Sequence, residues 1–89
     1  MDASRIMQRT TTGDVTTGSA YLRSVVLTGG SDAATAVIKA GGSGGTTMLT
    51  LAAATGVVAA SGDLHNALCS GGIHVTLTGT GPSVTVVYA

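Results

Sequence analysis

The chain has 89 residues and a net charge of zero, and 44% of its residues are hydrophobic whereas only 9% are charged and 2% aromatic. This length suits one small domain, and four basic residues are too few to neutralise many phosphates, so we expect no nucleic-acid partner. No stretch reaches the roughly 18 consecutive apolar residues of a membrane span, and the single Cys69 excludes an internal disulfide.

Residues 1–18 differ from the rest of the chain, because they hold four of its eight charged residues. Gly13 and Gly18 interrupt this segment, and the one helical turn that residues 4–9 could form is too short to be stable alone. We therefore predict an extended N-terminal arm over residues 1–18, followed by a β-domain over residues 19–89.

From residue 19 onward, apolar and polar residues alternate with a period of two and are bounded by glycines, a pattern typical of half-buried strands. The first predicted strand, residues 21–28, carries apolar side chains on both faces. Tyr21, Val25 and Leu27 share one face with Arg23, whereas Leu22 and Val26 lie opposite.

Residues 31–40 fit two structures. Ser31 could cap a helix that ends before Gly41, but the β-branched alternation favours a strand. The glycine-rich residues 41–45 then predict a hairpin loop leading into a strand over residues 46–52. A short strand of small residues is expected over residues 56–60.

The clearest alternation lies near the C-terminus, over residues 73–78 and 83–88. The turn sequence of residues 79–82 predicts that these two strands form a hairpin, with Pro82 at a strand start where its missing N–H is tolerated. Six short strands at about ten-residue spacing favour an all-β fold, a small antiparallel β-sandwich or a jelly-roll-like barrel.

Each candidate catalytic or metal-binding motif lacks a residue, an element or a spacing that its chemistry requires. Residues 41–47 lack the Lys of a phosphate-binding loop, and Ser43 between Gly41 and Gly45 lacks the helix that follows a nucleophile elbow. Four possible ligands have spacings that fit no standard zinc site, namely Asp63, His65, Cys69 and His74. We predict no enzyme, no cofactor and no metal.

A surface with so few charges has little to keep it monomeric, so we expect copies of the same chain or a partner to cover much of it. Residues 24–35, 49–53, 72–81 and 84–88 resemble, in style and motif order, a group of small virion proteins of tailed bacteriophages. The resemblance spans residues 19–89 and does not include the arm.

This resemblance implies a virion structural protein, a capsid decoration or cement protein on the outer capsid surface, made in the host cytoplasm. Its implied partners are the major capsid protein and further copies of itself, with a trimer favoured. We hypothesise that the arm anchors it through Arg5, Ile6, Met7 and Arg9. The alternative is a tail or fibre module that recognises host-surface carbohydrate, for which Thr50, Thr76, Thr78 and Thr85 could line a sheet face.

Overall fold

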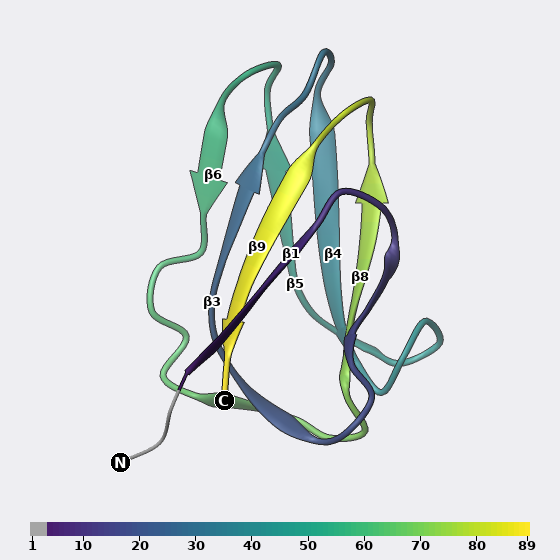
Figure 1. The fold of residues 1–89 in the computed structure, drawn as a ribbon, viewed down its shortest axis with the longest axis vertical. Helices are drawn as coiled ribbons and strands as arrows, with labels where there is room; N and C mark the ends of the chain where they lie inside the picture. The colour runs from purple at the N-terminus through teal and green to yellow at the C-terminus, as the bar shows by residue number, and fades with distance from the viewer. Residues whose placement is uncertain (1–3) are drawn as a thin grey trace.

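The computed structural model describes residues 4–89, which form nine strands arranged in two layers (Figure 1). Their bounds are β1 (Arg5–Arg9), β2 (Gly13–Thr16), β3 (Ala20–Thr28), β4 (Ala34–Ala40), β5 (Thr46–Ala53), β6 (Val58–Ala60), β7 (Ala67–Cys69), β8 (Ile73–Thr78) and β9 (Ser83–Tyr88). The predicted all-β fold is confirmed as a β-sandwich of two antiparallel sheets. The described residues include no helix long and apolar enough to cross a membrane.

Sheet A has the strand order β1-β9-β3-β6, with β7 also pairing with β3, and sheet B has the order β2-β8-β4-β5. Every pairing is antiparallel. The chain passes from one sheet to the other at every connection except those from β4 to β5 and from β6 to β7. Among the described residues, β4 and β5 are the consecutive strands that pair directly as a hairpin.

Small aliphatic side chains fill the space between the sheets, as expected for a chain with two tyrosines and no Phe or Trp. Sheet A contributes Leu22, Val25, Leu27, Val84 and Val86, and sheet B contributes Ala36, Ile38, Ile73 and Val75, all fully buried. These residues alternate along their strands because successive side chains point to opposite faces of a sheet. The alternation predicted for β4, β8 and β9 therefore corresponds to the observed core.

Strand β3 departs from regular alternation at a β-bulge between Leu22 and Ser24. The bulge places both Leu22 and Val25 in the core, although they are three residues apart, and leaves Tyr21 exposed. The prediction that Tyr21 and Val25 share a face is therefore wrong, because an extra residue in the strand reverses the facing of everything before it.

Residues 5–16 do not form a free arm. β1 lies beside β9 and β2 lies beside β8, so this segment supplies an edge strand to each sheet. The predicted boundary at residue 18 is corrected accordingly. Edge strands tolerate polar and charged side chains because one of their sides faces solvent, and this explains why the segment differs in composition from the rest of the sandwich.

The predicted hairpin of residues 73–78 with residues 83–88 is also wrong, since β8 lies in sheet B and β9 in sheet A. The turn between them is held by Ser31 and Asp32, in the loop between β3 and β4. The Asp32 carboxylate accepts hydrogen bonds from the Thr80 backbone N–H at 2.6 Å and from the Thr80 hydroxyl at 3.2 Å. The Ser31 N–H donates to the Thr80 carbonyl at 2.9 Å. Residues 79–82 therefore bridge the two sheets.

Candidate interaction surface

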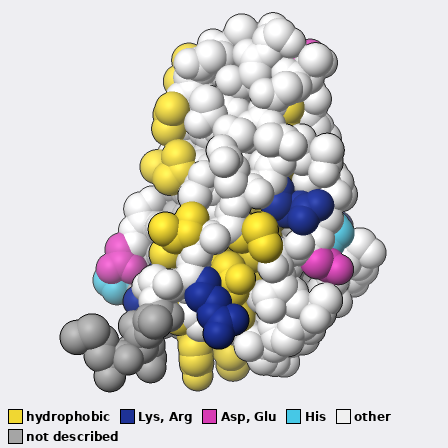
Figure 2. All heavy atoms as spheres, viewed as in Figure 1, with side chains coloured by type: hydrophobic (Ala, Val, Ile, Leu, Met, Phe, Trp, Pro, Cys, Tyr) yellow, Lys and Arg dark blue, Asp and Glu magenta, His cyan; other side chains and the backbone are white. Residues whose placement is uncertain are grey.

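The outward side of sheet A, which we call the outer face, carries most of the large exposed apolar side chains of the described residues. Cross-strand partners lie on the same side of a sheet, and the register pairs Ile6 with Val87 and Tyr21 with Leu68. The exposed fractions are 70% for Ile6, 49% for Tyr21 and 56% for Leu68. Figure 2 shows hydrophobic side chains on this side of the molecule, with Lys or Arg groups beside the central ones and acidic groups toward both edges.

The β3 and β6 strands extend this outer face toward one edge of sheet A. Val58 pairs with Thr28 and Ala60 pairs with Val26, so all four side chains share one side. Val26 is 36% exposed and Val58 is 58% exposed. The face is thus made of aliphatic, aromatic and threonine side chains, which suits contact with another weakly charged protein surface.

The four residues proposed to anchor the arm have different environments. Ile6 is exposed on the outer face and Arg5 is exposed at the start of β1. Met7 pairs with the buried Val86 and packs against the core, so its side chain is partly buried within the domain. Arg9 forms hydrogen bonds within its own chain. Of the four, Arg5 and Ile6 remain candidates for partner contact.

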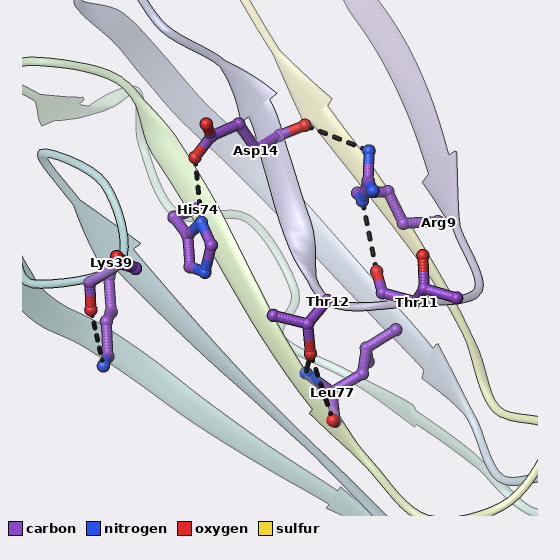
Figure 3. A network of polar contacts seen from close by, with 8 residues as sticks. Arg9, Thr11, Thr12, Asp14, Lys39, His74 and Leu77 are labelled. Atoms are coloured by element: carbon purple, nitrogen blue, oxygen red, sulfur yellow. Dashed lines mark hydrogen bonds and ion pairs between the residues drawn. The ribbon is translucent and has the colours of Figure 1, made fainter.

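Arg9 fastens the turn between β1 and β2 (Figure 3). Its Nε donates to the Thr11 carbonyl and its Nη1 to the Asp14 carbonyl, each at 3.1 Å. The Asp14 side chain in turn reaches β8, where its Oδ1 lies 2.8 Å from Nδ1 of His74. This chain of contacts ties the first two strands to each other and to sheet B, and His74 is 7% exposed beneath it.

The structure separates the four possible metal ligands of the sequence. His74 pairs with Asp14, whereas Asp63 and His65 lie in the loop between β6 and β7. Cys69 is fully buried on β7, and this burial raises the pKa of its thiol because an apolar environment disfavours the thiolate. Within residues 4–89, no three His, Cys, Asp or Glu side chains group as metal ligands would.

A polar hollow of about 460 Å³ lies where the β3 bulge meets the loop between β6 and β7, and it is lined by Arg23, Asp63, His65 and Asn66. Both β6 and β7 pair with β3, and residues 61–66 leave the sheet between them. His65 and Asn66 adopt φ values of 53° and 56°, a left-handed conformation that is uncommon for non-glycine residues but is adopted more often by Asn and His than by most. The Asp63 carboxylate supports the turn by accepting the His65 N–H at 2.8 Å.

The sequence did not identify most of the outer face. Its one signal was the first predicted strand, where apolar residues occupied both faces, as a strand with a core side and a contact side requires. Leu68 and Val58 lie in strands of three residues, which are too short for alternation to reveal which side faces out.

No family model, curated protein or solved structure matches this chain.

Proposed function

We propose that this protein is a virion structural protein of a tailed bacteriophage, a capsid decoration protein that binds the outer surface of the head through the outer face of sheet A. The major capsid protein is its partner in this proposal, and several copies decorate each particle. The protein acts by binding and has no reaction to catalyse.

The observation that carries this proposal is the outer face itself. Ile6, Tyr21 and Leu68 are about half exposed or more, on one side of a rigid sheet, in a chain where only 9% of residues are charged. Apolar patches that stay exposed on one face of a protein mark contact sites, because their transfer from water to an interface is favourable. A shell built of repeated subunits offers the same complementary site many times.

Co-expression with the major capsid protein from the same genome tests the proposal. Assembled shells are sedimented and the bound chain is quantified in the pellet. We expect the wild-type chain to co-sediment and the Ile6→Asp and Leu68→Asp variants to lose at least about tenfold in binding, because each would bury an unpaired charge. Ser43→Asp, in the exposed β4–β5 loop, adds the same charge away from the outer face and should bind like wild type.

Absence of the wild-type chain from the pellet would contradict the decoration role. Equal binding by all variants would show that another face contacts the shell. Each variant is first checked for a cooperative unfolding transition, so that loss of binding is not confused with loss of fold.

The polar hollow favours a second candidate function, a tail or fibre module that recognises carbohydrate at the host surface. The Arg23 guanidinium and the Asn66 amide can donate to sugar oxygens while the Asp63 carboxylate accepts from hydroxyls, so the hollow brings together donors and an acceptor for a sugar. Glycan-array binding that is lost in Arg23→Ala and retained in Ser43→Asp would support this function, and the absence of any binding would remove it.

A further inference from the structure

One lateral side of the sandwich lacks the charged residues and prolines that usually protect a sheet edge. This side, which we call the β5/β6 side, consists of the edge strand of sheet B, β5, and the edge strand of sheet A, β6, which contact each other across the layers. Residues 40–62, which include both strands, contain no charged residue and no proline. Met48, Val57 and Val58 expose 37%, 50% and 58% of their surface there.

The opposite side, formed by β1 and β2, is guarded. Arg5 and Arg9 lie on β1 and Asp14 lies on β2, and β2 is further interrupted by a bulge between Asp14 and Thr16. Charges and bulges on edge strands prevent pairing with other chains, because approach would bury the charge or break the hydrogen-bond register. The two sides of one small domain therefore differ in the property that controls strand addition.

Strand β5 is also long enough to pair. It spans eight residues, and its backbone bonds to β4 on one side. Between residues 46 and 53, no backbone hydrogen bond to any other described segment is present. The bulge in β5 lies near its start, opposite Ile38 and Lys39, and leaves the stretch from Leu49 to Ala53 in regular register with β4. This stretch has the length of a typical strand and presents unpaired N–H and C=O groups outward.

We propose that the β5/β6 side is the interface at which two copies of this chain associate, with β5 of one copy pairing antiparallel with β5 of the other. A second copy is the occupant that fits, because an antiparallel strand pair about a two-fold axis is self-complementary and uncharged edges meet without repulsion. The two four-stranded sheets then continue as one sheet of eight strands. Val57 and Val58 of the two copies add apolar contacts beside it.

This pairing forms a dimer and leaves no unguarded side to which a third copy could add. Each chain uses its unguarded side, and the sides that remain outward are the charged β1 and β2 edges of both copies. Closed pairing prevents the open-ended strand addition that leads to fibres. A dimer therefore replaces the trimer that the bacteriophage resemblance favours. The inference concerns the free protein and holds whether or not the outer face binds a capsid.

Light scattering coupled to size exclusion tests the inference on the full chain. We expect wild type to have twice the 8.6 kDa monomer mass. Thr50→Lys places a charge at an exposed position near the middle of β5, where it would lie close to the same charge on the second copy, and should halve the observed mass. Gln8→Lys, which adds the same charge at an exposed position on β1, is the matched control and should remain dimeric.

Hydrogen exchange locates the contact independently. Amides of residues 46–53 should exchange more slowly at high protein concentration than at low concentration, and this dependence should be absent in Thr50→Lys. A monomeric wild type at high micromolar concentration would overturn the inference. A dimer that survives Thr50→Lys, with protection on β1, β9 or β7 instead, would assign the contact to the outer face and equally overturn it. Shell binding by monomeric Thr50→Lys would leave the proposed function intact.

Discussion

Gly72 is the residue whose lack of a side chain the fold requires most clearly. It precedes β8 with a φ of +114°, and a Cβ at this position would lie 2.5 Å from the Thr16 carbonyl oxygen. The backbones at the end of β2 and just before β8 approach so closely here that a side chain on residue 72 would push them apart. The close approach and the left-handed φ both disfavour a side chain on residue 72, so both would destabilise a substituted protein.

We expect Gly72→Ala to lower the free energy of unfolding by about 2–4 kcal/mol, from the strained φ together with the backbone overlap. Urea denaturation followed by circular dichroism measures this change. Gly18→Ala is the control, because no atom lies within 4 Å of its added Cβ and its φ is not in the left-handed region. Its free energy of unfolding should change by less than about 1 kcal/mol. Equal effects of the two substitutions would contradict the proposed backbone approach.

Cys69 is fully buried against the core, and burial raises the pKa of its thiol. The thiolate is the reactive form, so both access and ionisation are reduced in the folded protein. Iodoacetamide should therefore modify Cys69 at least about tenfold more slowly in native buffer than in denaturant, as measured by mass spectrometry. Comparable rates in the two conditions would show that β7 opens readily from the edge of sheet A.

The same pKa shift gives a pH dependence. Because the folded thiol keeps its proton to a higher pH than the unfolded thiol, its contribution to stability is complete at neutral pH. It is lost as the pH rises through the pKa of the folded thiol. The free energy of unfolding of wild type should fall more steeply in the alkaline range than that of Cys69→Ala. Parallel pH profiles would contradict the shift.

At the scale of single strands, the register of β1 determines which of two neighbouring side chains is buried and which is exposed. Met7 faces the core beside Val86, whereas Ile6 faces outward beside Val87. We expect Met7→Ala to cost about 1–2 kcal/mol of unfolding free energy, as for a partly buried side chain, and Ile6→Ala to stay within about 0.5 kcal/mol. Thermal denaturation of the pair distinguishes them. A reversed order would mean that β1 pairs with β9 in the other register.

Removal of residues 1–18 tests whether β1 and β2 belong to the domain. An arm could be removed without loss of fold, but this deletion uncovers the edges of β9 and β8 and removes the Arg9 and Asp14 contacts. We expect the shortened chain to show no cooperative unfolding transition and to aggregate. A folded, soluble product would show that the two strands add little to the stability of the sandwich.

The sequence was sufficient to predict elements that depend on residues close together in the chain. The alternation over β4 and the glycines after it predicted the β4–β5 hairpin, because neighbouring strands joined by a flexible loop pair with each other. It was insufficient for β8 and β9. Their turn sequence shows that the chain reverses, but its destination is set by Asp32, which lies 48 residues before Thr80. Contacts of that separation leave no periodic signal.

The outer face was missed for a related reason. Its exposed residues come from β1, β3, β6 and β7, and they share a side only because these strands pair with one another or with β9. A bulge in β3 further reverses the facing of Tyr21. Exposure of an apolar residue depends on the assembled sheet, so single-strand patterns could indicate an apolar contact side without naming its members.

For the whole molecule, the low charge has a measurable consequence. With four basic and four acidic residues in the chain, the proposed associations through the outer face and the β5/β6 side would involve few ion pairs. We expect a tenfold increase in salt concentration to change shell binding, measured by co-sedimentation, by less than about twofold. A strong decrease would indicate that Arg5 or another charged group carries the contact.

The antiparallel pairing of β1 with β9 places Arg5 directly across from Tyr88 (Figure 1). A linker of a few residues between the start of β1 and the end of β9 would therefore close the described strands into a ring, and new ends could be opened in the glycine-rich β4–β5 loop, where an added Cβ at Gly44 would meet open space. Such a circular permutant would keep every strand pair described above. By the same geometry, peptides attached at the start of β1 and at the end of β9 would leave the sandwich side by side, an arrangement suited to displaying two ligands together.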